Sequence, residues 1–240
     1  MTAAGFKEAK REHNSVLAAA EKRALVWMAY RMPQWVNSDH LTFLGLTAMF
    51  FAGLSYWYAS VRELGLWLVI FCLVVNWFGD SLDGTLARVR NRQRPRYGFY
   101  VDHIVDAFCM LFLFTGLALS GYMSWLAAAG LLVAYFMLCL EVYLATYAVG
   151  VFHISFAGFG PTELRIVLAV GNMAAISHKY IIVWGHSLLL FDVGAVVAMV
   201  GMFLLMVQSA VKHSVQLYEE ERLPCIPPRK TGTKACCYAG

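Results

Sequence analysis

Long apolar stretches separated by short polar ones run through most of this 240-residue chain. A helix needs about 20 apolar residues to cross the hydrocarbon core of a bilayer. The pattern predicts six crossings, at residues 40–60, 64–86, 103–122, 124–148, 162–178 and 188–211. These runs are too long and too uniformly apolar for the alternating strands of a membrane barrel. We therefore expect an all-α integral membrane protein with six transmembrane helices.

The chain ahead of the first crossing has a different pattern. Residues 1–22 alternate Lys, Arg and Glu with alanine, and the apolar run from Ala24 to Tyr30 is too short to span a membrane. Such a segment is typical of an amphipathic helix that lies on the membrane surface. The expected organisation is an N-terminal amphipathic, juxtamembrane segment at 1–38, a six-helix transmembrane domain at 39–215 and a flexible cytoplasmic tail at 216–240.

Composition and charge placement support a membrane protein and suggest its orientation. The residues AVILMFWYC make up 60% of the chain and charged residues only 14%, against about 25% charged residues in soluble domains. We therefore do not expect a water-soluble monomer. Basic residues gather in the N-terminal segment, between the second and third crossings, and in the tail, which predicts cytoplasmic N and C termini. We expect no nucleic-acid partner.

Four aspartates stand out in a chain so poor in charge. Asp80, Asp83, Asp102 and Asp106 fall within 27 residues and flank arginines at 88, 90, 92, 94 and 96. Carboxylates inside membrane helices are costly and usually functional. The pairs are three and four residues apart, so each pair projects from one helical face. Two adjoining helices can therefore bring four carboxylates together.

Such a cluster predicts metal and phosphate chemistry. Ionised carboxylates at close range repel one another unless cations lie among them. Ligands that are all oxygen favour Mg²⁺, Mn²⁺ or Ca²⁺ over zinc, and arginines close by favour a phosphate as the second anion. Two metal ions and a phosphate are the requirements of phosphoryl transfer.

Small residues accompany the aspartates. Gly84 and Ala87 extend the face of Asp80 and Asp83, and Gly98 precedes Asp102 by one helical turn. Small side chains let either a neighbouring helix or a bulky ligand approach the backbone. Helix packing alone is one interpretation, and a ligand site is the interpretation favoured by the carboxylates beside them.

The run Asp80-x-x-Asp83-Gly84-x-x-Ala87-Arg88, followed by Gly98-x-x-x-Asp102-x-x-x-Asp106, resembles the signature of the CDP-alcohol phosphatidyltransferase family. Every position of the signature is filled, and the spacer between Arg88 and Gly98 is one residue longer than is usual. The resemblance implies a six-span fold with a surface helix ahead of it. It also implies an enzyme that moves a substituted phosphate from a CDP-linked donor to an alcohol and releases CMP.

The resemblance also implies roles for individual residues. Asp80, Asp83 and Asp102 would bind two divalent metal ions, Mg²⁺ or Mn²⁺. Asp106 would contact the second ion and act as the general base that deprotonates the acceptor hydroxyl. The CDP moiety would be contacted by Gly84, Ala87, Arg88 and Gly98. The protein would be a homodimer whose active site opens at the cytoplasmic membrane interface.

Four further residues are candidates for binding the acceptor: Glu141, His153, Glu163 and Arg165. Glu141 lies within the fourth crossing, where an unpaired carboxylate is costly, so it should face the bundle interior. Glu163 suits the dipole at the start of the fifth crossing. Capping does not explain Arg165, one turn further in, and we favour it as a ligand of the acceptor or another polar head group.

The sequence leaves open which CDP-linked donor and which acceptor the enzyme uses. A phosphatidyl transfer from CDP-diacylglycerol to an alcohol is the preferred hypothesis, and transfer from CDP-choline or CDP-ethanolamine to diacylglycerol is the alternative. The small number of cations outside the arginine loop slightly favours an uncharged or amino alcohol as the acceptor. An intramembrane prenyltransferase also uses aspartate pairs with Mg²⁺, but its motifs should lie on widely separated spans. A transporter should show broken helices in matching halves, which this sequence lacks.

Overall fold

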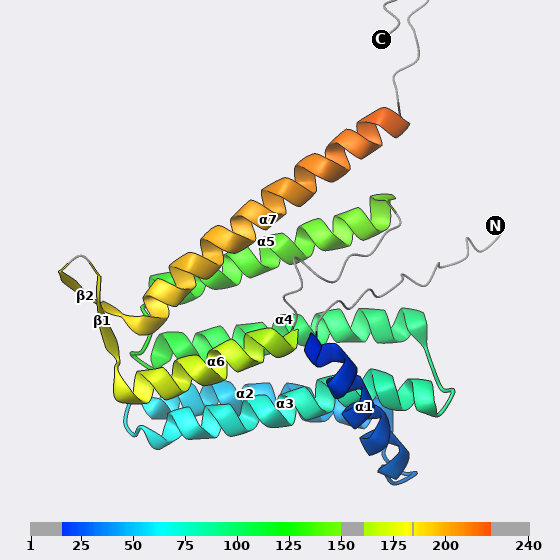
Figure 1. The fold of residues 1–240 in the computed structure, drawn as a ribbon, viewed down its shortest axis with the longest axis horizontal. Coiled ribbons are helices and arrows are strands. Elements are labelled where there is room, and N and C mark those ends of the chain that lie inside the picture. The colour runs from blue at the N-terminus through cyan, green and yellow to red at the C-terminus, as the bar shows by residue number, and fades with distance from the viewer. Residues whose placement is uncertain (1–15, 150–160, 184, 222–240) are drawn as a thin grey trace, which may run out of the picture.

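The computed structural model describes residues 16–149, 161–183 and 185–221 (Figure 1). This part of the chain is almost entirely helical. Its elements are α1 (Val16–Arg31), α2 (Ser38–Ala59), α3 (Leu64–Val89), α4 (Pro95–Leu119), α5 (Trp125–Val149), α6 (Pro161–Ser177), β1 (Tyr180–Val183), β2 (His186–Leu189) and α7 (Leu190–Glu220).

Among the described residues, five helices are long and apolar enough to cross a membrane: α2, α3, α4, α5 and α7. They confirm the expectation of a helical, multi-pass membrane protein. The predicted crossing at 162–178 corresponds to α6, which has 17 residues. At 1.5 Å per residue α6 is about 25 Å long, shorter than the hydrocarbon core of about 30 Å. Its length therefore does not confirm a sixth crossing.

Two helices extend further than the sequence predicts. α4 begins at Pro95 and not at residue 103, because proline suits the first helical turn, where its missing N–H is not needed. Gly98 therefore lies on the same helix as Asp102 and Asp106. α7 continues to Glu220, beyond the predicted end of the crossing at 211 and of the domain at 215.

A hairpin that the sequence pattern did not predict lies between α6 and α7. β1 and β2 pair antiparallel, with Tyr180 opposite Leu189 and Val183 opposite His186. Gly185 has φ +83°, a conformation that glycine adopts readily and that tight hairpin turns use. Each strand has only four residues, too few for alternation to stand out from the apolar runs beside it.

Helix α2 packs against both α3 and α4, and glycines allow the close approach. A Cβ atom added at Gly116 of α4 would overlap the backbone of Gly53 in α2, and one added at Gly79 of α3 would lie 2.6 Å from the carbonyl oxygen of Leu41. Backbones that approach this closely admit no side chain at the contact. These glycines hold α3 and α4 on either side of α2.

We expect Gly116→Ala to destabilise the protein, because backbone atoms of Gly53 cannot move aside as a flexible side chain would. Overpacking of this kind costs about 1–3 kcal/mol. The measurement is the thermal unfolding midpoint of the purified protein in detergent. The matched control is Gly201→Ala on α7, where an added Cβ meets no described atom within 4 Å. Equal midpoints for the two variants would contradict the close contact.

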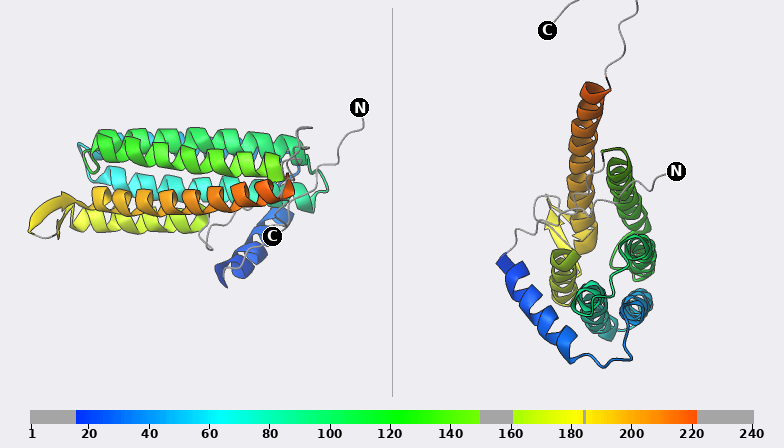
Figure 2. Two further views of the ribbon diagram at one scale, coloured as in Figure 1. Left: turned by 90° about the horizontal axis from the view of Figure 1, so that it is seen from above. Right: turned by 90° about the vertical axis from the view of Figure 1, so that its right-hand side faces the viewer.

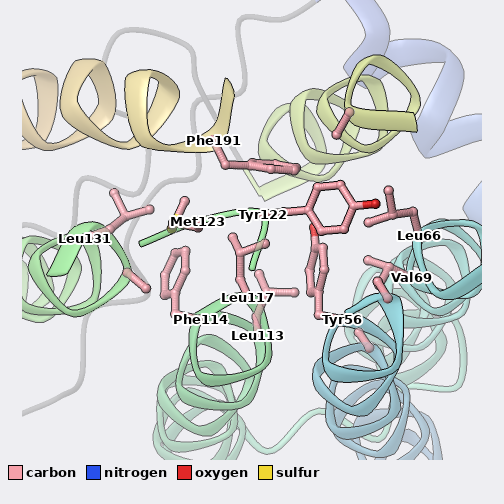
Figure 3. Packing of buried hydrophobic residues seen from close by; sticks show 14 of the residues in the cluster. Tyr56, Leu66, Val69, Leu113, Phe114, Leu117, Tyr122, Met123, Leu131 and Phe191 are labelled. Carbon is pink, nitrogen blue, oxygen red and sulfur yellow. The ribbon is translucent and has the colours of Figure 1, made fainter. Parts of the chain in front are cut away.

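The main apolar core lies where α2, α3 and α4 meet α5, α6 and α7 (Figure 3). Tyr56 is fully buried and packs edge-to-face on Phe191, with 6.4 Å between ring centroids. Leu66, Leu113 and Leu117 are also fully buried beside them. α5 and α7 pack against each other and diverge from the α2–α4 group towards the C-terminal end of α7 (Figures 1 and 2).

A second core joins α1 to the opposite end of the bundle, which we call the site end because it carries the α3–α4 connection. Leu25 and Ala29 of α1 are buried against Leu82 and Leu86 of α3. Glu21 of α1 accepts a hydrogen bond of 2.7 Å from Trp77 Nε1. Figure 2 shows α1 crossing the bundle obliquely here. A helix therefore precedes α2 as expected, and its position on a membrane surface stays a prediction.

Candidate active site

Asp83 is held in place by the first turns of α2. Its side chain is almost buried, and Thr42 Oγ1 donates a hydrogen bond of 2.6 Å to Asp83 Oδ2. The backbone N–H of Gly84 donates to the other carboxylate oxygen, and Ser38 Oγ donates to the Asp83 backbone carbonyl at 3.1 Å. Sequence reasoning missed Ser38 and Thr42. Their signal is a pair of hydroxyl residues four apart at the start of an otherwise apolar helix.

Asp80 meets an arginine from α6. Arg165 Nη2 lies 2.5 Å from Asp80 Oδ2, and Arg165 Nε donates to Asn76 Oδ1 at 2.8 Å. Asn76 Nδ2 in turn donates to the carbonyl oxygen of Gly45 at 3.0 Å. Arg165, which we expect to bind the acceptor or another polar head group, thus contacts a carboxylate of the signature. Its role in binding the acceptor stays a prediction.

The four aspartates form one electrostatic cluster. Asp106 interacts with Asp80, Asp83 and Asp102, and also with Arg165. Asp83 interacts with Asp80 and Asp102. α3 and α4 thus bring the two predicted pairs into electrostatic range of one another, at the site end of the bundle.

The chemistry of this donor set suits a hard divalent cation, since all four side chains offer only oxygen. As the side chains lie, Asp80 is paired with Arg165 and Asp83 with Thr42. Within residues 16–149, 161–183 and 185–221, no group of three or more His, Cys, Asp or Glu side chains converges closely enough to hold a metal ion. The residue types fit the cation, and binding it requires a rearrangement of these contacts.

The small residues beside the carboxylates have open surfaces. A Cβ atom added at Gly84 would meet only the tip of the Arg88 side chain, at 3.6 Å, and one added at Gly98 would meet no described atom within 4 Å. Gly79, by contrast, lies against the α2 backbone. Helix packing within the described chain therefore does not explain Gly84 or Gly98. Ala87, one turn beyond Asp83, is partly buried.

The arginines between α3 and α4 have different roles. Arg90 donates to the carbonyl oxygens of Met32, Pro33 and Val36, and thereby fixes the α1–α2 connection. Arg94 binds both carboxylate oxygens of Asp39, at 2.5 and 2.6 Å. These two arginines therefore contact the α1–α2 connection and the first turn of α2, whereas the sequence indicated only that the arginine run lies near a phosphate. Arg88 lies on the glycine side of α3 and donates to Thr85 Oγ1 at 3.1 Å.

The other acceptor candidates are dispersed. Glu141 of α5 lies 2.8 Å from His213 Nδ1 of α7, and both side chains are largely buried. The expectation that Glu141 faces the protein interior is therefore met, in a contact between α5 and α7. Glu163 is partly buried in the first turn of α6. His153 lies outside the described residues.

An apolar cavity of about 220 Å³ lies between α4 and α5. It lies within electrostatic range of one carboxylate, because Tyr135, Cys139 and Tyr143 of its lining interact with Asp106. Its lining is made up of His103, Ile104, Ala107, Tyr135, Phe136, Cys139, Leu140 and Tyr143. No local sequence pattern predicts this cavity, because its lining is brought together only when α4 and α5 pack against each other.

The fold and site define a multi-pass helical membrane protein with a carboxylate cluster and an open glycine surface at one end. The family model for CDP-alcohol phosphatidyltransferase matches residues 35–208, which include all the signature residues. The chain therefore belongs to the CDP-alcohol phosphatidyltransferase family, and it is a transferase. No curated protein matches the chain significantly.

Proposed function

We propose that the protein transfers a phosphatidyl group from CDP-diacylglycerol to an alcohol and releases CMP. The observation that carries this proposal is the cluster of four carboxylates on α3 and α4 beside the open surfaces of Gly84 and Gly98. Carboxylates can hold the cations that phosphoryl transfer needs, and an open glycine surface can admit a nucleotide to the backbone.

In this proposal Asp80, Asp83 and Asp102 hold two divalent ions, Mg²⁺ or Mn²⁺, and Asp106 contacts the second. The ions supply Lewis acidity, which polarises the phosphoryl oxygens and neutralises charge in the transition state. Thr42 orients the Asp83 carboxylate through its hydrogen bond of 2.6 Å. Gly84, Ala87, Arg88 and Gly98 contact the CDP moiety.

The chemistry is a substitution at the phosphorus that carries diacylglycerol. The acceptor hydroxyl oxygen forms a bond to this phosphorus. The bond between the phosphorus and the bridging oxygen of the diphosphate breaks. CMP leaves with that oxygen, and Asp106 accepts the hydroxyl proton as general base. The apolar cavity between α4 and α5 supports a lipid substrate, because it offers an apolar surface whose Tyr135 and Tyr143 lie within electrostatic range of Asp106.

The proposal includes a membrane arrangement. The site end faces the cytoplasm, α1 lies on that surface, and α6 provides a sixth crossing together with the hairpin that follows it. Charge supports this orientation, because Arg88, Arg90 and Arg94 gather at the site end. The homodimer is proposed from the family resemblance alone, and cross-linking in intact membranes tests it.

The deciding experiment is an assay of CMP release by membranes that contain the protein. CDP-diacylglycerol is offered with a panel of uncharged, amino and phosphorylated alcohols, and in a parallel arm CDP-choline and CDP-ethanolamine are offered with diacylglycerol. We expect CMP release in the first arm, loss of activity in excess chelator, and recovery with Mg²⁺ or Mn²⁺. Activity confined to the second arm would favour an aminoalcohol phosphotransferase, and full activity in chelator would contradict metal dependence.

Gly84→Leu should weaken nucleotide binding much more than divalent-ion binding, because a branched side chain would occupy the open surface beside the carboxylates. The comparison is between the CDP affinity and the Mn²⁺ affinity of one purified variant. Gly201→Leu on α7, also in open surroundings, is the matched control and should change neither affinity. Equal losses of both affinities with a lower unfolding midpoint would show instead that Gly84 serves helix packing.

A further inference from the structure

Arg165 enters the carboxylate cluster from α6, a helix that carries none of the signature residues. Its guanidinium lies 2.5 Å from Asp80, and only 14% of its side chain is exposed, against 29% for Asp80. It also interacts electrostatically with Asp106. A cation from outside the signature therefore contacts Asp80 of one carboxylate pair and interacts electrostatically with Asp106 of the other.

The position of this guanidinium is fixed from a second side. Arg165 Nε donates to Asn76, and Asn76 is itself anchored to the α2 backbone at Gly45. The third nitrogen, Nη1, is buried and has no hydrogen-bond partner among the described residues. A buried donor without a partner is unfavourable, so this arrangement satisfies the arginine incompletely.

Electrostatics explains why an arginine lies here. Four carboxylates in range of one another repel, and a positive guanidinium among them offsets part of that repulsion. A divalent ion bound to the Asp80 carboxylate would lie close to the guanidinium on Oδ2, and the two cations would repel each other at that distance. The guanidinium and the ion therefore compete for the negative charge of Asp80.

We propose that Arg165 is a built-in counter-ion of the carboxylate cluster, which competes with the divalent ion for Asp80 and is released when the ion binds. This inference rests on the metal dependence in the proposed function. Asn76 keeps the released guanidinium next to the site, where Nη1 and Nη2 can donate to an anionic group such as a phosphate. Arg165 is thus a positioning residue, and its contact between α6 and Asp80 depends on whether the metal ion is bound.

The test is Mn²⁺ binding to the purified full-length protein in lipid nanodiscs, measured by calorimetry. Arg165→Gln removes the competing charge and should bind Mn²⁺ roughly tenfold more tightly or better, because one unit charge close to the ion is lost. Arg165→Lys keeps the charge and should stay near the wild-type affinity. Lys212→Gln removes a positive charge from an exposed position on α7 and is the matched control.

A second measurement needs no variant. Arginine-specific modification of Arg165 by phenylglyoxal, followed by mass spectrometry, should increase several-fold when Mn²⁺ is added to the wild-type protein, because the ion pair no longer protects the guanidinium. Unchanged or weaker Mn²⁺ binding by Arg165→Gln, or unchanged modification, would overturn the counter-ion role while leaving the proposed function intact. No Mn²⁺ binding by the wild type would overturn both.

Discussion

Asp83→Asn should reduce CMP release to below about 1% of the wild-type rate while the protein remains folded and inserted in the membrane. The substitution keeps the shape of the side chain, and the amide oxygen can still accept the hydrogen bond from Thr42. It removes one of the negative charges that a divalent ion requires. Replacing a residue that only hydrogen-bonds to a metal ligand typically lowers metal affinity or activity about 10–100-fold. Replacing a proposed direct ligand should therefore lower activity further.

The control for Asp83→Asn is Asp39→Asn, which makes the same change of charge at the same end of the bundle. Asp39 is about half exposed and pairs with Arg94, which is not a residue of the signature. We expect this variant to keep most of its activity. CMP release and the thermal unfolding midpoint are measured for both. Normal turnover by Asp83→Asn, or an equal loss in Asp39→Asn, would remove Asp83 from the proposed metal site.

Local sequence patterns were sufficient for most of the helices. Each of α2, α3 and α5 coincides with one apolar run, because a long apolar helix is the arrangement that satisfies its own backbone in lipid. The start of α4 was missed because Arg94, Pro95, Arg96 and Gly98 are typical of a loop when only hydropathy and turn residues are considered. The hairpin at Tyr180–Val183 and His186–Leu189 was missed because its strands are short and adjoin apolar helices.

The site was predictable where its residues follow one another on a helix. The spacing within Asp80/Asp83 and Asp102/Asp106 placed each pair on one face, and the packing of α3 and α4 around α2 brings the pairs into range. The contacts of Asp83 with Thr42 and of Asp80 with Arg165 join residues 41 and 85 positions apart. A single sequence contains no local signal for such pairs, since they depend on how the helices pack.

The contacts of the arginines could not be predicted for the same reason, because they too depend on how the helices pack. Alternate basic residues between two crossings indicate orientation, but they do not reveal which side chains find partners. Arg90 is occupied by backbone carbonyls of the α1–α2 connection and Arg94 by Asp39. Arg165 is a residue that capping does not explain, and its role as a ligand of the acceptor stays a prediction. Its contact with Asp80 could not be predicted, because a single sequence does not show that α6 packs against α3.

Asp106→Asn should separate binding from catalysis. Asp106 lies one helical turn beyond Asp102 on α4, and it interacts electrostatically with Tyr135 of the apolar cavity. As the proposed general base, it must accept the proton of the acceptor hydroxyl, which an amide cannot do. The variant should retain affinity for CDP-diacylglycerol and bind at least one Mn²⁺ ion, and it should lose the chemical step by roughly 10²-fold or more, the usual contribution of acid–base assistance.

The comparison that decides this assignment is with Asp80→Asn, measured by donor affinity, Mn²⁺ stoichiometry and single-turnover CMP release. Asp80 is a proposed ligand of the ions, so its variant should lose Mn²⁺ and donor binding together with turnover. Asp106→Asn should lose turnover while it keeps donor binding and at least one Mn²⁺ ion, because its electrostatic contribution to the cluster is shared with three other carboxylates. If Asp106→Asn loses donor binding as completely as Asp80→Asn, Asp106 is a metal ligand without a separate role as base. If it turns over normally, the proton leaves by another route, and the chemistry proposed for α4 is wrong.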